Sequence, residues 1–312
     1  MHEVTGDVRS GVDLSRFRDE YPWDSEWFDR GSSKMHYLDE GEGDPVVFVH
    51  GNPTWSFYWR RLVKELAGDH RCVVPDHIGM GLSDKPLDAD YDYTLKSRVD
   101  DLEALLEHLG ITERITLVLH DWGGMIGLAF AQRHPERIAR LVLMNTAGFF
   151  LPEGRGLPWQ LWLIKNLPFA LPVRGLNAFV VGALHTCSTR PGRMTAPIKA
   201  GYAAPYDSWG HRIAVHRFVQ DIPLAPGHPA FDVVDAVHKN LDQWRGTPVQ
   251  IFWGEKDFVF DMHFLAEWRR RLPDAEYHQF PDCGHYILED AHEEIVPRLR
   301  AFLAAHPLPA PE

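Results

Sequence analysis

Four short apolar runs, rich in valine, isoleucine and leucine, follow one another in the first half of the chain. They occupy residues 45–50, 71–76, 115–120 and 138–145. A run that is apolar on both faces is typical of a strand whose sheet is covered by helices on both sides. Between the runs, residues 94–109 carry apolar positions at helical spacing up to Gly110, and residues 123–134 form a second helical stretch that Pro135 ends. This alternation predicts a parallel sheet with right-handed crossovers.

The alternation stops at residue 149 and returns only in the last third of the chain. Residues 149–227 hold many aromatic residues, prolines and glycines, and no clear strand. The later elements are a strand at 247–254, a helix at 262–272, a strand at 275–280 and a helix at 291–305. Long excursions from a regular fold are usually functional. We therefore expect an α/β core formed by residues 1–148 and 228–312, with a helical lid at 149–227 inserted after the fourth of these strands.

Composition and charge narrow the classes of protein. The 312 residues carry 32 basic and 44 acidic side chains, a formal net charge of −12, which argues against nucleic acid and anionic membranes as partners. The longest apolar stretch, 157–185, is interrupted by charges and prolines, so we expect no membrane span. The three cysteines form no CxxC pair, and the first residues lack the pattern of a secretory signal. These features favour a cytoplasmic protein with reduced cysteines.

The strongest local motif is LHDWGG at residues 119–124. It has the form of a nucleophile elbow, in which a strand leads through a sharp turn into a helix whose glycines allow close packing. Asp121 occupies the place of the nucleophile, and no G-x-S-x-G motif occurs in the chain, which argues against a serine esterase. A carboxylate that attacks carbon forms an ester with the enzyme. The alternative for Asp121 is a simple cap of the following helix.

Hydrolysis of such an ester requires a base and a group that orients the base. In this arrangement the chain order is nucleophile, acid, histidine. Asp257 follows the strand at 247–254, and His285 follows the strand at 275–280. Both lie where the carboxyl ends of parallel strands place active sites. Glu255 is a second candidate for the acid, but it lies nearer the end of its strand, so we expect Asp257 in this role.

Two further residues carry candidate donors. Asn52, in the HGNP motif at 50–53, follows the first strand, and its backbone N–H together with that of Trp122 is placed to bind charge on an ester carbonyl. Their side-chain amide and indole N–H groups suit a departing halide, although core packing is the alternative for Trp122. The spacing of Gly123, Gly124 and Gly127 does not match a dinucleotide fingerprint, and no zinc-binding motif is present. We therefore expect no metal and no cofactor.

Taken together, these motifs resemble the haloalkane dehalogenase family of α/β-hydrolases over roughly residues 21–305. The matching segments are HGNPTWSFYWR at 50–60, PDHIGMGLSDKP at 75–86, LHDWGGMIG at 119–127, MNTAGF at 144–149, FWGEKD at 252–257 and CGHYILED at 283–290. The resemblance implies an α/β-hydrolase fold with a mostly parallel central sheet. It also implies Asp121 as nucleophile, His285 as base, Asp257 as acid, and Asn52 with Trp122 as halide ligands. Some members carry a glutamate after the strand that ends at residue 145; Asn145 and Thr146 stand there in this chain, which supports Asp257.

The implied activity is cleavage of a carbon–halogen bond through an aspartyl-alkyl ester, followed by hydrolysis with His285-activated water. The same motifs resemble a subgroup shared with the β-lactone decarboxylases of long-chain olefin synthesis, so this reading stays open. A third possible function is epoxide hydrolysis, with the lid tyrosines Tyr202 and Tyr206 as proton donors. A fourth is a binding protein that has kept the pocket without catalytic activity. In the lid, the residues expected to line an apolar tunnel for an alkyl chain are Phe149, Phe150, Trp159, Trp162, Phe169 and Phe179. Tyr202 and Tyr206 are further candidate pocket residues, with local packing of their rings and hydroxyls as the alternative. The substrate is therefore a small apolar molecule; chain length, halide preference and oligomeric state do not follow from the sequence.

Overall fold

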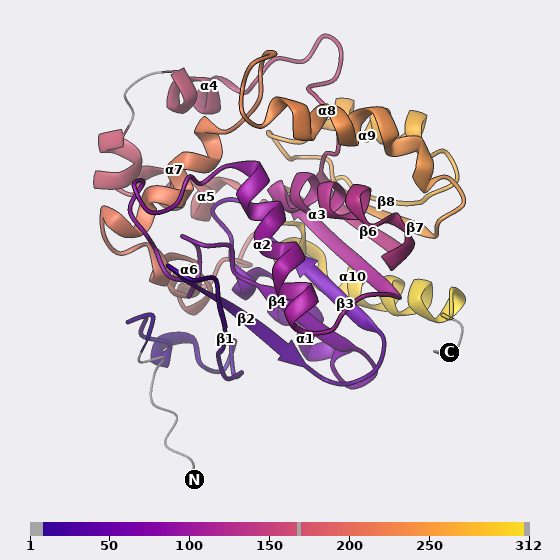
Figure 1. Cartoon of the computed structure of the whole chain (residues 1–312), viewed down its shortest axis with the longest axis horizontal. Helices are drawn as coiled ribbons and strands as arrows, with labels where there is room; N and C mark the ends of the chain where they lie inside the picture. Colours follow the sequence, from indigo (N-terminus) through magenta and orange to yellow (C-terminus); the bar gives the residue numbers. More distant parts are fainter. Residues whose placement is uncertain (1–8, 167–169, 309–312) are drawn as a thin grey trace.

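The structure is a computed structural model that describes residues 9–166 and 170–308, and an eight-stranded sheet organises it (Figure 1). The strand order is β1-β2-β4-β3-β5-β6-β7-β8. Strands β1 and β2 pair antiparallel, β2 pairs antiparallel with β4, and all other neighbours are parallel. The strands are β1 Glu26–Asp29, β2 Lys34–Glu40, β3 Pro45–Val49, β4 Arg71–Pro75, β5 Ile115–Asp121, β6 Ile138–Thr146, β7 Val249–Gly254 and β8 Glu276–Phe280.

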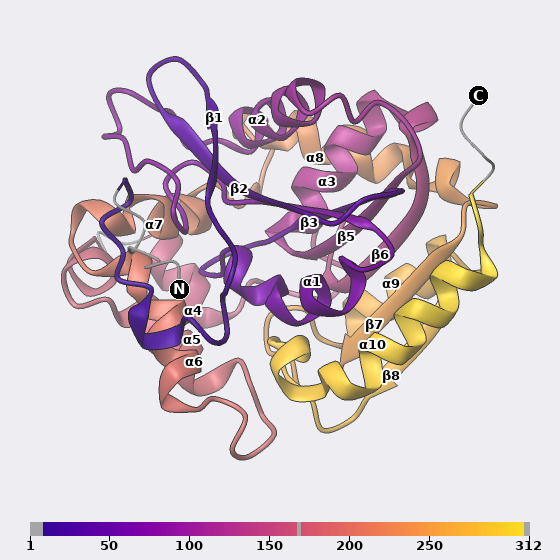
Figure 2. The same cartoon turned by 90° about the horizontal axis from the view of Figure 1, so that it is seen from below.

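Helices cover both faces of this sheet, as the doubly apolar strands predict. Figure 2 shows α2, α3 and α8 on one face and α1 and α10 on the other. The helices are α1 Arg60–Leu66, α2 Leu95–His108, α3 Trp122–Arg133, α4 Trp159–Asn166, α5 Ala178–Thr186, α6 Ala196–Ala203, α7 Ile213–Gln220, α8 Phe231–Asn240, α9 Met262–Arg271 and α10 Ile287–Ala305. Short turns of 3-10 helix lie at Ser15–Phe17, Ser56–Trp59, Pro135–Arg137, Ala204–Tyr206, Gly210–Arg212 and Leu241–Trp244, and a π-helical turn at Leu171–Gly175.

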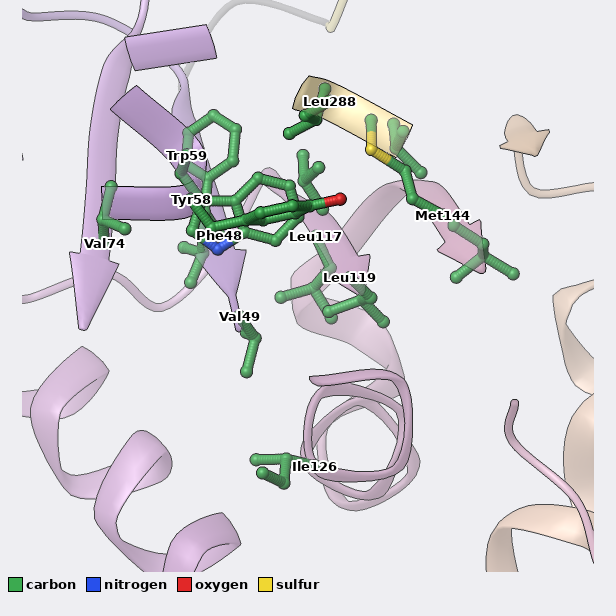
Figure 3. Close-up of a cluster of buried hydrophobic side chains, with 14 of the residues drawn as sticks. Phe48, Val49, Tyr58, Trp59, Val74, Leu117, Leu119, Ile126, Met144 and Leu288 are labelled. Atoms are coloured by element: carbon green, nitrogen blue, oxygen red, sulfur yellow. The ribbon is translucent and has the colours of Figure 1, made fainter. Parts of the chain in front are cut away.

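The core lies on both sides of the central strands. All residues of β5 are buried, and in β6 only Ala139 is partly exposed. Figure 3 shows side chains from β3, β5 and β6 packed against the aromatic pair Tyr58 and Trp59 and against Leu288 of α10. Burial of this kind contributes about 25 cal/mol per Å² of apolar surface and stabilises the central strands.

The segment 149–227 folds into α4 to α7, and its described residues form no strand. In both views these helices lie together beyond one end of the sheet (Figures 1 and 2). Among the described residues, no helix is long and apolar enough to span a membrane.

The predicted strands and four predicted helices are present within a few residues of their expected ends. Four elements, β1, β2, α1 and α8, were not predicted from the sequence. Strands β1 and β2 lie at the antiparallel edge of the sheet and carry charged residues at both ends, so they form no continuous apolar run. Helix α1 has only seven residues, too few for a clear helical period.

Candidate active site

The carboxyl ends of four strands bring the predicted polar residues together. Asp121 is the last residue of β5, Asn52 follows β3, and Asp257 and His285 follow β7 and β8. Since β3, β5, β7 and β8 belong to one parallel part of the sheet, their carboxyl ends meet at the same edge.

Asp121 has a backbone conformation that non-glycine residues seldom adopt, with φ 53° and ψ −129°. Its Oδ1 accepts hydrogen bonds from the backbone N–H of Trp122 and, at 2.9 Å, from that of Asn52. An ordinary cap side chain accepts from the second or third residue of the helix, whereas Trp122 is the first. The geometry is therefore that of a strained elbow that orients one carboxylate oxygen, beyond simple capping.

Three glycines make this close packing possible. A Cβ atom on Gly51 would lie 2.1 Å from Oδ1 of Asp121, and one on Gly123 would lie 1.9 Å from the carbonyl oxygen of Val49. A Cβ on Gly124 would lie 1.8 Å from Oγ1 of Thr146. Any larger residue at these positions would displace the strand ends, which explains the glycines of both motifs.

His285 connects the two carboxylates. Its Nδ1 lies 2.7 Å from Oδ2 of Asp257, and its Nε2 lies 3.2 Å from Oδ2 of Asp121. The other oxygen of Asp257 accepts the backbone N–H groups of Val259 at 2.7 Å and Phe260 at 3.1 Å, so this carboxylate is fixed on both sides. In contrast, Glu255 accepts a hydrogen bond from the exposed Gln279. The structure therefore brings Asp121, His285 and Asp257 together and leaves Glu255 outside.

Charge sets the protonation of this group. Burial opposes a charge on His285, but Asp257 and Asp121 outweigh it and raise the pKa of His285 to about 10. Burial likewise opposes the charge of Asp121, but the hydrogen bond and charge of His285 lower its pKa. At neutral pH the two residues are therefore an imidazolium and a carboxylate. Burial lowers the pKa of the neighbouring His120 to about 3, so that ring is neutral; its Nε2 lies 2.8 Å from the carbonyl oxygen of His285.

The side chains of Asn52 and Trp122 both line the cavity beside Asp121. Nδ2 of Asn52 donates a hydrogen bond to the carbonyl oxygen of Val215 at 3.0 Å, which ties this side chain to α7. The ring of Trp122 packs at a tilt against Phe218, also of α7, with centroids 5.5 Å apart. Helix α7 therefore fixes both predicted donors.

The cavity that contains this site has a volume of about 550 Å³ and a mostly apolar lining. Asp121 and His285 are among its few polar lining residues, and α4 and α5 contribute to its walls. Trp159 of α4 also lines it, with 68% of its surface exposed. A volume of this size is within the range of ligand pockets and accommodates a substantial apolar molecule.

The expected lining residues behave differently from one another. Phe149, Phe150, Trp159 and Phe179 line the cavity. Trp162 does not: its side chain is 48% exposed on the outer surface of α4. Phe169 lies outside the described residues.

Tyr202 and Tyr206 are buried and are not among the described residues that line the cavity, so the expected pocket role is wrong and the packing alternative agrees with the structure. The hydroxyl of Tyr202 donates to Oε1 of Glu289 at 2.5 Å, and Glu289 forms a paired hydrogen bond with the buried guanidinium of Arg60. The hydroxyl of Tyr206 lies 3.4 Å from the carbonyl oxygen of Thr54. Packing between the helical segment and the core uses these hydroxyls, so neither reaches an epoxide bound at Asp121.

Several lining residues do not follow from the sequence patterns. Phe258, Phe260 and Phe264 line the cavity, and the ring of Phe260 lies nearly parallel to that of His285 with centroids 5.9 Å apart. The apolar residues directly after Asp257 were the available signal. Most other lining residues come from α3, α5, α8, the π-helical turn and the segment after β6, as well as from α4 and α7. Only the packing decides which side of each element faces the cavity.

Asp290 fixes the position of the His285 loop. Its buried carboxylate accepts the backbone N–H of Gly284 at 2.8 Å and the hydroxyl of Ser188 at 2.6 Å, as well as backbone N–H groups of Thr189 and Arg190. The end of α5 and the histidine loop are therefore held as one unit.

A model of the alpha/beta hydrolase fold matches residues 44–292, so the chain belongs to this family, as its motifs predict. It is 52% identical over 283 residues to a cis-3-alkyl-4-alkyloxetan-2-one decarboxylase of Shewanella oneidensis, covering 90% of this chain and 89% of that protein. It is 31% identical over 304 residues to a haloalkane dehalogenase of Mycolicibacterium paratuberculosis, covering 93% and 97%. A solved haloalkane dehalogenase from Bradyrhizobium elkani superposes with a TM-score of 0.79 at 26% identity, over 90% of this chain and 99% of that one. The predicted resemblance to dehalogenases and β-lactone decarboxylases is confirmed.

Proposed function

We propose that this protein decarboxylates cis-3,4-dialkyl β-lactones to alkenes, with Asp121 as the nucleophile. The observation that carries the proposal is the difference in relatedness: identity to the decarboxylase is 52%, against 31% for the dehalogenase, at similar coverage. The apolar cavity at the carboxylate supports it, because a lactone with two alkyl chains needs apolar walls around one reactive point.

The first step opens the lactone ring. Oδ1 of Asp121 is held by two backbone N–H groups, which leaves Oδ2 as the attacking atom. It attacks C4 of the lactone, the C4–O1 bond breaks, and O1 leaves as part of a carboxylate. Attack from behind the C4–O1 bond places the new ester oxygen antiperiplanar to the C2–C3 bond. A positioned carboxylate nucleophile of this kind divides one difficult step into two easier ones.

The second step releases the products. The C2–C3 bond breaks, its electron pair forms the C3=C4 double bond, and Asp121 departs from C4 as a carboxylate while CO₂ is released. Inversion at C4 followed by anti elimination retains the cis arrangement of the two chains. The two N–H groups at Oδ1 and the charge on His285 stabilise the returning carboxylate. No water is consumed, and His285 acts as a cation.

The remaining polar groups and the helical segment have roles in this scheme. Asn52 and Trp122 line the cavity beside Asp121 and bind the carboxylate of the ring-opened intermediate. Residues 149–227 act as the lid that keeps water from the ester, because α4, α5 and the residues after α7 supply much of the apolar wall.

Haloalkane dehalogenation is a second candidate, which Asn52 and Trp122 favour because neutral donors at the cavity suit a halide ion. In that reaction Asp121 displaces the halide, and His285 must act as a base. Esterification of Asp121 removes one of the negative charges that raise the pKa of His285, so the imidazolium releases its proton to solvent more readily and the neutral ring is then available as a base.

One experiment compares the two reactions. Purified protein is incubated with a long-chain cis-3,4-dialkyl β-lactone and, in parallel, with 1-bromoalkanes of several lengths, and alkene, alcohol and bromide are quantified. We expect conversion of the lactone to the cis-alkene, and none with Asp121→Ala. Alkyl bromide turnover without lactone turnover would contradict the proposal.

Water labelled with 18O provides an independent measurement. Hydrolysis of an aspartyl ester transfers a solvent oxygen into the Asp121 carboxylate over many turnovers, whereas decarboxylation does not. We expect the peptide that contains Asp121 to keep its mass after extended lactone turnover. A gain of one labelled oxygen would show that the ester is hydrolysed.

A further inference from the structure

His50 lies directly before the Gly51–Asn52 peptide and is completely buried. It is not one of the described residues that line the cavity. Its Nδ1 lies 2.8 Å from the carbonyl oxygen of Gly51. Its Nε2 accepts the backbone N–H of His77 at 3.2 Å. The proposed reaction assigns no role to this ring.

The partners of His50 determine which nitrogen carries its proton. A backbone N–H can only donate, so the nitrogen facing His77 must be without a proton. A carbonyl oxygen can only accept, so the nitrogen facing Gly51 must carry one. The backbone therefore selects a single neutral tautomer, with the proton on Nδ1. Burial agrees with this state, since it lowers the pKa of His50 despite the nearby charge of Asp76.

Two hydrogen bonds, one at each end of the Gly51–Asn52 peptide group, connect Nδ1 of His50 to Asp121. The carbonyl of the Gly51–Asn52 peptide accepts from His50, and the N–H of the same peptide donates to Oδ1 of Asp121 at 2.9 Å. A peptide group is delocalised, so a hydrogen bond donated to its carbonyl oxygen makes its N–H a stronger hydrogen-bond donor. Successive hydrogen bonds of this kind strengthen one another in a buried site.

We propose that His50 is a positioning residue that orients and polarises the Gly51–Asn52 peptide, so that its N–H stabilises the charge on Asp121. The inference rests on the proposed function, in which Asp121 leaves carbon as a carboxylate. His77 holds the His50 ring in this position, because its Nε2 lies 2.9 Å from the carbonyl oxygen of His50 and the two ring centroids lie 4.3 Å apart.

Three variants test the proposal. His50→Leu removes the donor at similar volume. His50→Asn keeps a donor, because the Asn amide nitrogen takes the place of Nδ1. Val47→Ala, in strand β3, which ends directly before His50, creates a cavity without touching the hydrogen bonds and serves as the control for lost stability.

We expect kcat for the β-lactone to fall about tenfold or more in His50→Leu, since loss of a whole oxyanion donor costs roughly 10²–10³-fold. His50→Asn should restore most of this rate, and KM should change little in either variant. Two results would show that His50 has only a structural role. In the first, His50→Leu reduces kcat no more than does Val47→Ala when the two variants have the same melting temperature. In the second, His50→Asn has the same low kcat as His50→Leu.

A spectroscopic measurement on the unmodified protein needs neither a folded variant nor a substrate. The 15N shifts of the His50 ring at neutral pH should correspond to a protonated Nδ1 and an unprotonated Nε2. The opposite tautomer, or a doubly protonated ring, would overturn the proposal even where the lactone is turned over. Failure to convert the lactone together with the expected tautomer would instead count against the proposed function.

Discussion

Nε2 of His285 and Oδ2 of Asp121 lie 3.2 Å apart, and both side chains are almost completely buried. The opposite charges of this pair stabilise each other in a medium where either alone would be unfavourable. One oxygen of Asp121 is bound by backbone N–H groups, and the other faces His285. In the proposed reaction, attack by Asp121 removes its charge, so each step alters the environment of His285.

The first prediction concerns stability and pH. The pKa of His285 is raised from 6.5 to about 10 in the folded protein. A raised pKa contributes stability that is fully present below pH 6.5 and is lost as the pH rises through about 10. We expect the free energy of unfolding to fall as the pH rises through this range, by a few kcal/mol more in the unmodified protein than in His285→Gln. Urea titrations at a series of pH values measure this difference. Parallel curves for the two proteins would contradict the ion pair.

The second prediction concerns Asp257. Asp257→Asn keeps a hydrogen-bonding side chain beside Nδ1 of His285 but removes the charge that contributes most to holding the proton. The basic limb of the kcat–pH profile should therefore move to lower pH. Once that limb lies below pH 8, turnover at pH 8 should fall roughly tenfold for each further pH unit that the limb moves. Glu255→Gln is the control, because this side chain pairs with Gln279 at the surface. Equal profiles for the two variants would remove Asp257 from its role.

The third prediction concerns Asp290. Asp290→Ala leaves several donors of the α5 end and the His285 loop without an acceptor in a buried region. Each unpaired buried group costs about 1–3 kcal/mol, so we expect a total loss of roughly 2–5 kcal/mol in the free energy of unfolding. Asp282→Ala, at an exposed neighbouring position, should leave the urea midpoint almost unchanged. A similar midpoint for both variants would show that Asp290 does not hold this loop.

The fourth prediction concerns substrate length. Gly182 of α5 lines the cavity, and a Cβ atom there would meet no other atom within 4 Å. Gly182→Leu should therefore fit without a clash and improve helix propensity by up to about 1 kcal/mol. Each methylene of substrate that it displaces is worth about 0.8 kcal/mol, so kcat/KM for long-chain lactones should fall several-fold while short chains are unaffected.

The control for substrate length is Val181→Leu, at the preceding, outward-facing position, which is 45% exposed. Kinetics with a series of chain lengths gives the comparison. An equal loss for all lengths in Gly182→Leu would indicate a distorted helix and not a filled cavity.

The central strands and the three residues Asp121, Asp257 and His285 follow from local sequence. A strand buried on both faces must be apolar throughout, so β3, β5 and β6 are visible as runs. Each of the three polar residues lies at or just after the end of a strand, and the geometry of a parallel sheet then brings their side chains together. The elbow glycines could be predicted for the same reason, since close approach of backbone to backbone leaves no room for a Cβ.

The helical segment could not be assigned residue by residue, because local patterns do not state which face of a helix meets the cavity. The sequence leaves Tyr202 open between a proton donor and a packed side chain. In the structure its hydroxyl belongs to a buried group with Glu289 and Arg60, residues 87 and 142 positions away from it along the chain in opposite directions. The contact of Phe260 with His285 and the hydrogen bonds of Asp290 to the histidine loop likewise depend on how the folded segments pack. The sequence by itself determined the chemistry available at the strand ends. Only the tertiary structure decided which oxygen of Asp121 faces the cavity and which side chains surround that cavity. These contacts join segments far apart in the chain, and the packing of such segments depends on side-chain volume and hydrogen bonding together.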